Sequence, residues 1–128
     1  MRILSAAALL LSLTAPAMAQ VVIPALPKEM LGIWGVAPAD CKDEDSDGRL
    51  TVEAKRVASF AVVFKLGEIR KQPDGSLKVA AARFDEGEQR RPRASLELKL
   101  LAPDKLHVKS DRNETITYSR CKKTGKTG

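Results

Sequence analysis

The sequence has few of the residues from which enzymes build reactive sites. It contains one histidine, His107, and two cysteines, and aromatic residues make up only 4% of the chain. It has no Gly-x-Ser-x-Gly nucleophile motif and no paired-histidine metal motif. The shortage of aromatic rings also argues against a nucleic-acid surface, because such surfaces stack bases on aromatic side chains. We therefore expect a protein that is not an enzyme, needs no cofactor and does not bind nucleic acid.

Long apolar runs are missing too, except at the start of the chain. Arg2 is followed by the apolar run Ile3 to Leu13, and the small residues Ala17-Met18-Ala19 precede Gln20. A basic start, a short apolar run and small residues are, in this order, the three regions of a signal peptide. The run is about half as long as the roughly 20 residues that span a bilayer. We expect residues 1–19 to be removed after Ala19, which leaves a periplasmic or secreted protein without a transmembrane segment.

The remaining length supports one domain. Removal of 19 residues from 128 leaves 109, which is within the size of a single small domain. We place this domain at residues 20–121 and expect residues 122–128, which are rich in lysine and glycine, to form a flexible basic tail.

The export prediction determines how the two cysteines are interpreted. Thiols outside the cytoplasm are usually paired, so Cys41 and Cys121 are predicted to form one disulfide. They lie near opposite ends of the predicted domain, so the bridge would join its beginning to its end.

The rest of the chain shows alternation of apolar and polar residues, which is typical of β-strands with one buried face. Turn formers such as Asp47-Gly48 and Pro73-Asp74-Gly75 separate the runs, and short spacers favour antiparallel neighbours. With a first strand at 33–36 and a break near Gly67, about eight strands are expected in an up-and-down barrel, with a two-sheet sandwich as the alternative. Residues 53–56 could instead form a helical turn. The apolar positions of the alternating runs are Leu50, Val52, Phe60, Val62, Phe64, Leu66, Leu77, Val79, Ala81, Leu96, Leu98, Leu100, Leu106, Val108, Ile116 and Tyr118.

Two short motifs resemble a known family. Gly32-Ile33-Trp34 in the first strand and Arg120 at the end of the last are similar to the Gly-x-Trp and terminal-arginine signature of lipocalin-like barrels. The resemblance implies that the arginine covers the tryptophan at the closed end of the barrel, a contact worth roughly 0.5–2 kcal/mol. The wider layout, which ends in Tyr118-Ser-Arg-Cys, looks like a largely uncharacterised group of small exported proteins of Gram-negative bacteria.

The most specific chemical motif is an acidic segment. Asp43, Asp45 and Asp47, followed by Gly48, resemble the first ligands and the turn glycine of an EF-hand calcium loop. Ala54 stands where the closing bidentate glutamate should be, and Asp47-Gly48 is also a good hairpin turn. We therefore expect a solvated acidic loop and keep Ca²⁺ binding as an alternative.

Positive charge dominates the rest of the chain. Residues 40–53 carry two bases and six acids, a net charge of 2 − 6 = −4, whereas residues 54–128 carry 18 bases and nine acids, a net charge of 18 − 9 = +9. Such a surface suits anionic partners. The candidate contacts in the densest basic groups are Arg90, Arg91, Arg93, Lys122 and Lys123.

Three functions follow from these features. The first is a non-enzymatic periplasmic barrel that binds an envelope component, or a small ligand in an interior lined by Phe60, Val62, Phe64 and Leu66. The second is an inhibitor of a peptidoglycan hydrolase or protease, since exported bacterial barrels of this size resemble lysozyme and metalloprotease inhibitors. There the segment 21–27 could enter a cleft, although the long-range cysteine pair departs from that group's local disulfide. The third is a calcium-stabilised module. We expect the first.

Overall fold

The computed structural model describes residues 20–86, 91–111 and 114–122, with the side chains of Arg91 and Pro92 left out. This part of the chain consists of strands and two short 3₁₀ helices, η1 (Lys28–Met30) and η2 (Pro38–Cys41). None of its helices is long and apolar enough to cross a membrane. The strands are β1 (Val21–Ile23), β2 (Gly32–Gly35), β3 (Arg49–Glu53), β4 (Arg56–Ser59), β5 (Val62–Lys71), β6 (Leu77–Asp85), β7 (Arg91–Ala102), β8 (Lys105–Ser110) and β9 (Thr115–Arg120).

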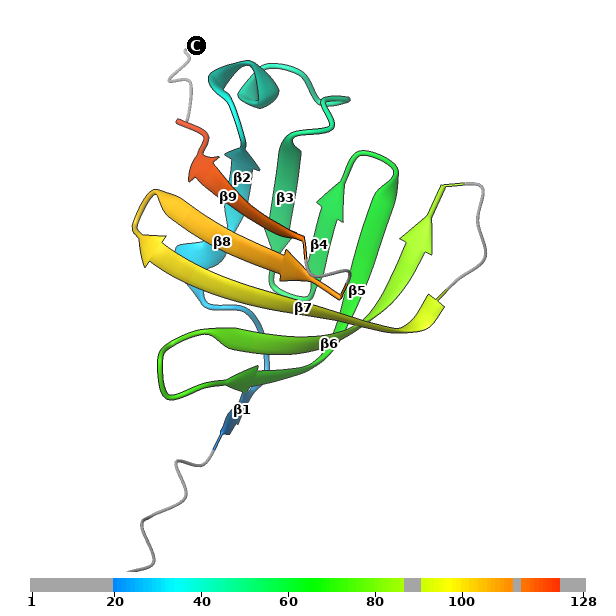
Figure 1. Cartoon of the computed structure of the whole chain (residues 1–128), viewed down its shortest axis with the longest axis vertical. Helices are drawn as coiled ribbons and strands as arrows, with labels where there is room; N and C mark the ends of the chain where they lie inside the picture. Colours follow the sequence, from blue (N-terminus) through cyan, green and yellow to red (C-terminus); the bar gives the residue numbers. More distant parts are fainter. Residues whose placement is uncertain (1–19, 87–90, 112–113, 123–128) are drawn as a thin grey trace, which may run out of the picture.

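Strands β2 to β9 form a closed antiparallel barrel (Figure 1). Each strand pairs with the next along the chain, and the ring is completed where β2 pairs with β9. The predicted eight-stranded up-and-down barrel is confirmed, and the sandwich alternative is wrong because one continuous sheet closes on itself. Closure leaves no free edge in the ring.

β1 is a ninth strand that extends the barrel wall. The first part of β5 pairs with β4, from Val62 to Lys65, and its last part pairs with β1, from Ile69 to Lys71. β1 therefore takes the place beside β5 that β4 has left (Figure 1). Leu26, three residues after β1, is buried, and its backbone N donates to the carbonyl oxygen of Ala54 at 2.9 Å. The segment proposed for an inhibitor's cleft contact thus forms part of the protein's own wall.

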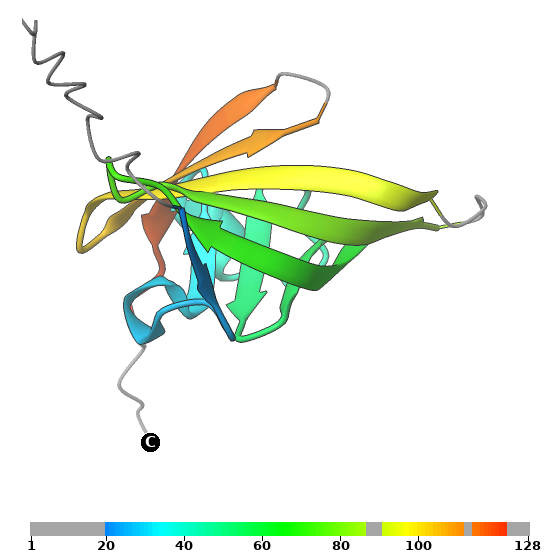
Figure 2. The same ribbon diagram turned by 90° about the horizontal axis from the view of Figure 1, so that it is seen from below.

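The interior is filled by apolar side chains from every wall of the barrel. Seen from below in Figure 2, β5, β6 and β7 run side by side and the shorter strands β2, β3 and β4 lie across from them. The alternating runs send one side chain in two into this space, and their buried members form a single cluster. Its largest fully buried members are Trp34, Ile69, Leu77, Leu98 and Leu106.

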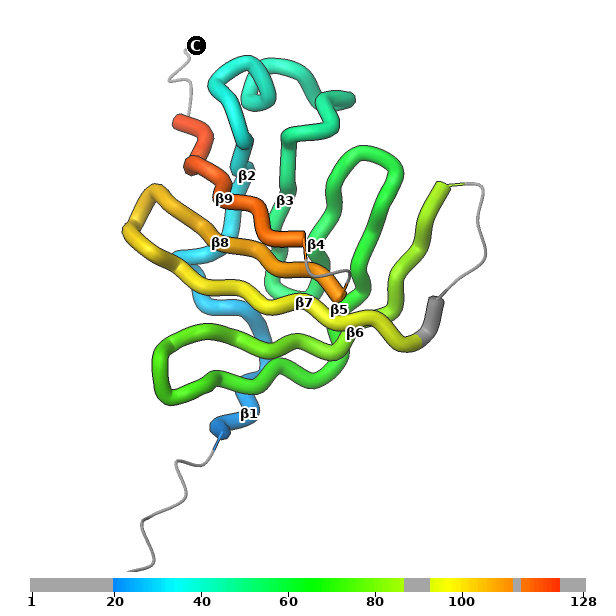
Figure 3. Tube along the Cα trace, in the orientation of Figure 1, coloured from blue at the N-terminus to red at the C-terminus, as the bar shows by residue number. Residues whose placement is uncertain are grey.

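Two sequence predictions about strand boundaries are wrong. Glu53 pairs with Arg56, so Ala54 and Lys55 form a two-residue hairpin turn instead of a helical turn. The trace of β5 continues without interruption past the expected break near Gly67 (Figure 3). The irregularity there is a bulge, because the pairing of β5 with β6 shifts between Leu66 and Ile69. The bulge adds one residue, which is why both Leu66 and Ile69 face inward although they are three apart.

The predicted interior position of Phe60 is also wrong. Ser59 pairs with Val62, so Phe60 and Ala61 form the β4–β5 turn, and Ala61 has a φ of 68°. The Phe60 side chain is 47% exposed, whereas Phe64 and Leu66 are buried and Val62 is half-buried. The alternation of inward and outward side chains in β5 starts only at Val62, because the two-residue turn separates Phe60 from the strand.

Candidate functional site

One end of the barrel is closed by a contact between Trp34 and Arg120. Trp34 has 0% exposure, and the Arg120 guanidinium carbon lies 4.2 Å from the centroid of its ring. The Trp34 indole Nε1 donates to the carbonyl oxygen of Met30 in η1 at 3.0 Å. The contact that the family resemblance implied is therefore present, and it ties the last strand to the short helix that covers this end.

The Arg120 side chain is fully engaged in this closure. Its guanidinium donates to the carbonyl oxygens of Leu31 at 2.8 Å, Pro103 at 3.2 Å and Glu29. Gly32 is required here because it has a φ of 128° and a Cβ atom would lie 3.2 Å from Arg120 Nη1. The predicted group of Gly32, Trp34 and Arg120 is thus brought together as a structural closure with little capacity for a ligand.

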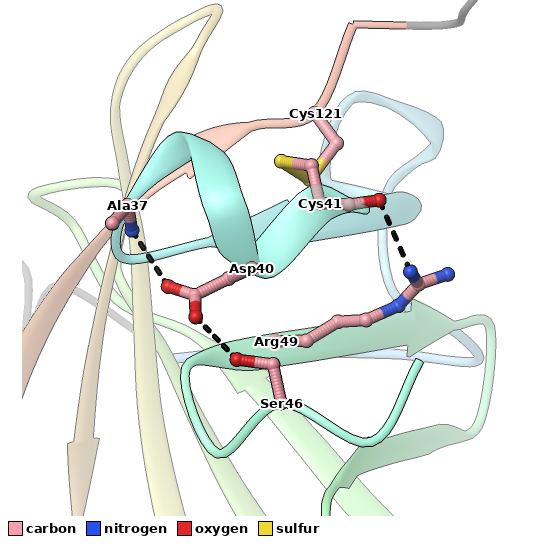
Figure 4. Close-up of a disulfide and its surroundings, with 6 residues drawn as sticks. All are labelled: Ala37, Asp40, Cys41, Ser46, Arg49 and Cys121. Carbon is pink, nitrogen blue, oxygen red and sulfur yellow. Dashed lines mark hydrogen bonds between the residues drawn. A yellow bond between two sulfur atoms is a disulfide. The ribbon is translucent and has the colours of Figure 1, made fainter. Parts of the chain in front are cut away.

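The predicted disulfide is confirmed. The Sγ atoms of Cys41 and Cys121 are 2.01 Å apart, and the Cα atoms are 5.5 Å apart (Figure 4). Cys121 directly follows β9, and its backbone N donates to the carbonyl oxygen of Ile33 in β2 at 2.9 Å. Cys41 ends η2, the helix that follows β2. The bridge therefore spans the seam between the first and last strands of the ring.

The acidic segment is organised by Asp40, which the sequence analysis did not single out. The Asp40 carboxylate accepts hydrogen bonds from the backbone N of Ala37, at 2.7 Å, and from the Ser46 hydroxyl (Figure 4). Arg49 closes the same loop from β3, because its guanidinium donates to the carbonyl oxygen of Cys41 at 3.2 Å. Asp40 lies in η2, which begins at Pro38, and a proline is typical of the first position of a helix.

The candidate calcium ligands do not converge in the structure. The Asp43 carboxylate accepts a hydrogen bond from the backbone N of Asp45 at 2.9 Å, while Asp43, Asp45 and Asp47 are all exposed. In the described residues, no group of three or more His, Cys, Asp or Glu side chains is placed to hold a metal ion.

Hydrogen bonding and burial shift three pKa values. Hydrogen bonds from Ser46 and then Ala37 lower the pKa of Asp40. Hydrogen bonds from the Ser76 hydroxyl and backbone lower the pKa of Asp74 in the β5–β6 turn, and Lys99 adds a smaller effect. Burial raises the pKa of Tyr118, and the negative charge of Asp40 acts in the same direction. The two carboxylates are therefore held as acceptors by local turns.

The Asp40 contacts predict a specific loss of stability in acid. Because its pKa is lowered on folding, Asp40 stabilises the fold above its unfolded pKa, and this contribution is lost as the pH falls through the folded pKa. Asp40→Asn is expected to lose less stability than the wild type between about pH 5 and pH 2, measured as urea unfolding free energy against pH. Asp47→Asn, at an exposed position, is the control and should follow the wild-type profile. An unchanged acid profile for Asp40→Asn would show that its carboxylate does not stabilise the loop.

A nearly buried ion pair lies in the barrel wall at the end of β6. Arg83 Nε is 2.6 Å from Asp85 Oδ1, with side-chain exposures of 12% and 11%. The Arg83 guanidinium carbon also lies 5.5 Å from the centroid of the Phe64 ring. Arg83 and Asp85 lie opposite Phe64 and Val62, so both are on the inward face of β6, and this placement follows from the strand register and not from the sequence alone.

The outer face of β5 to β8 carries two adjoining open depressions of about 500 and 440 Å³. Their floor is made of the small residues Gly67, Ala80 and Ser95. Ala80 of β6 pairs with Ser95 of β7, and Gly67 of β5 lies on the other side of Ala80. We call this region the outer groove. Around the floor stand the outward charged residues Lys65, Glu68, Arg70, Lys78, Arg93, Glu97, Lys109 and Asp111.

The predicted basic contacts are only partly brought together. Arg93 is exposed and lines the outer groove, whereas Lys122 is exposed beyond the end of β9, beside the β2 seam. Arg90 and Lys123 lie outside the described residues, as does the side chain of Arg91. The other cations of the groove, Lys65, Arg70, Lys78 and Lys109, are scattered along the chain and meet only through cross-strand pairing, so the sequence does not single them out.

Comparisons with protein-family models, with curated proteins and with solved structures found no match to this chain.

Proposed function

We propose that this chain is a non-enzymatic, exported binding protein that engages an anionic component of the bacterial cell envelope through the outer face of its barrel. The observation that carries the proposal is the difference in side-chain chemistry between the inner and outer faces of the barrel wall. Apolar side chains fill the inside, and the outside carries the outer groove with its cationic margin. Export to the envelope is part of the proposal and rests on the signal-like residues 1–19.

The filled interior favours an external partner over a small internal ligand. Of the four residues considered for an inner pocket, Phe64 and Leu66 belong to the packed cluster and Val62 packs against it. The fourth, Phe60, is in an exposed turn. A ligand inside the barrel would have to displace part of a close-packed core, which costs stability.

Charge supports an anionic partner. The cations around the outer groove are Lys65, Arg70, Lys78, Arg93 and Lys109, against the acids Glu68, Glu97 and Asp111, a balance of 5 − 3 = +2. Glu68 is already paired with Arg70 at 3.0 Å. The chain as a whole carries a formal charge of +6. Exposed charges of one sign attract oppositely charged surfaces, and salt screens this attraction.

The proposal predicts salt-sensitive binding to envelope fragments. Mature protein, residues 20–128, should co-sediment with isolated Gram-negative envelopes. Its apparent affinity should fall at least about tenfold from 0.1 to 1 M NaCl, because the Debye length shrinks from about 10 to about 3 Å. Lys78→Gln with Lys109→Gln should weaken binding at low salt several-fold. The control, Lys28→Gln with Lys42→Gln, removes the same charge from exposed positions outside the groove.

Binding that ignores salt, or that falls equally in both double variants, would contradict a role for the outer groove. Absence of co-sedimentation at low salt would contradict envelope binding itself.

A further inference from the structure

We infer that the ligand of the outer groove is an acidic glycan, bound as an extended chain across strands β5 to β8. This inference rests on the proposed function and names the chemistry of its ligand. It is carried by the cross-strand row of small residues on the floor and by the mixture of charges along its margin.

The row of small residues on the floor runs across the strands. Ala80 of β6 pairs with Ser95 of β7, and Gly67 of β5 lies next to Ala80, where a Cβ atom would be in van der Waals contact with the Ala80 carbonyl oxygen at 3.4 Å. Beyond Ser95 the row continues at Asp111, which directly follows the end of β8 and the pair between Leu96 and Ser110. Neighbouring strands are about 4.8 Å apart, so this row crosses roughly 15 Å of surface. That length accommodates a short run of sugar rings.

The floor of small residues is bordered by longer side chains on both sides. Two residues along the strands towards the β5–β6 turn, Arg70 pairs with Lys78, Lys78 with Glu97 and Glu97 with Lys109. On the other side stand Lys65 and Arg93. A thin ligand on the floor would therefore meet charged groups along both of its edges.

The charge mixture suits a ligand with both hydroxyl and acidic groups. Glu97 lies between Lys78 and Lys109, and Glu68 lies beside Arg70. Lysine and arginine can donate to the carboxylates or phosphates of an acidic glycan, while glutamate and aspartate accept from its hydroxyls. The acids Glu68, Glu97 and Asp111 share the margin with the cations, so a ligand that carries hydroxyl groups beside its acidic groups finds partners for both.

An extended peptide fits less well than a glycan. Peptides that bind sheets gain most of their affinity from main-chain hydrogen bonds to a free strand edge. In the groove, β6 and β7 are each paired on both sides, so a peptide crossing them would find no such edge. Its backbone N–H groups would lie over the Ala80 methyl group, which accepts no hydrogen bond.

Isothermal titration of the mature protein tests this inference with three hexasaccharides: oligogalacturonate, heparin and neutral maltohexaose. We expect both acidic probes to bind and the neutral probe to bind at least about tenfold more weakly, since charge-assisted hydrogen bonds are lost. Ala80→Phe, which fills the floor at an exposed position, should weaken acidic-glycan binding at least about tenfold. The matched control is Thr117→Phe, on the exposed face of β9, and it should bind like the wild type.

The outcomes separate this inference from the proposed function. Envelope binding without binding to either acidic hexasaccharide would overturn the glycan inference and leave the envelope proposal standing. Equal affinity for acidic and neutral probes would overturn the inference as well. So would tight binding to phosphatidylglycerol vesicles that Ala80→Phe does not change, because a membrane would then be the partner. Loss of both envelope and glycan binding would overturn both proposals. Circular dichroism of each variant establishes that it is folded.

Discussion

Reduction of the Cys41–Cys121 disulfide is expected to lower the free energy of unfolding by about 4.5 kcal/mol, the value that loop-closure entropy gives for a loop of this length. The two cysteines are separated by 80 positions, so the bond restricts nearly the whole unfolded domain. For a domain of about 100 residues, this corresponds to a decrease in melting temperature on the order of 20 °C. Thermal unfolding followed by circular dichroism, with and without reductant, measures the effect.

The position of the bond makes its loss especially damaging. β2 and β9 pair over only two positions, Trp34 with Arg120 and Gly35 with Ser119, whereas β5 and β6 pair over most of their length. The disulfide therefore reinforces the shortest pairing in the ring. The double variant Cys41→Ala, Cys121→Ala should melt near the temperature of the reduced wild type, and reductant should not change it further. A wild type whose melting is insensitive to reductant would show that the bond does not stabilise the barrel.

Much of the fold could be predicted from the sequence, because strand alternation and compartment are local signals. Leu77, Val79 and Ala81 face inward as their spacing indicated, and the pairing of Cys41 with Cys121 followed from predicted export. The errors arose where the two-residue period is interrupted. A two-residue turn at Phe60-Ala61 and a bulge at Gly67 each change which residues face inward. Phe60-Ala61 has no turn-forming composition, and Gly67 indicates an irregularity without showing whether the strand ends or bulges there.

The outer groove could not be predicted, because its residues meet through register. Lys65, Lys78 and Lys109 each look like an ordinary solvated strand residue, while contiguous runs such as Arg90-Arg91 attract attention in a sequence. The bulge in β5 also matters, since it changes which side chains after Gly67 face outward. Sites built on the outside of a barrel depend on such details, and alternation alone does not fix them.

Trp34→Ala is expected to destabilise the protein by about 3–5 kcal/mol, because it removes the largest fully buried side chain and leaves a cavity at the closed end. Arg120→Ala should cost about 2 kcal/mol or more, since Arg120 donates to the carbonyl oxygens of Leu31 and Pro103. Arg120→Lys should recover only part of this loss, because lysine keeps the charge but lacks the planar fork that reaches several carbonyl groups and stacks on the indole.

The stability losses of Trp34→Ala and Arg120→Ala should not add in the double variant, because the guanidinium and the indole stabilise each other's position. With Trp34 absent, Arg120 loses the ring that it covers at 4.2 Å, so its own removal costs less. We expect a coupling energy of about 1 kcal/mol from urea unfolding of the two single variants and the double variant. Additivity within about 0.3 kcal/mol would mean that the stacking contributes little and that Arg120 acts through its carbonyl contacts alone. A coupling energy of about 1 kcal/mol would instead show that the contact between the guanidinium and the indole itself stabilises the pairing of β9 with β2 at the closed end.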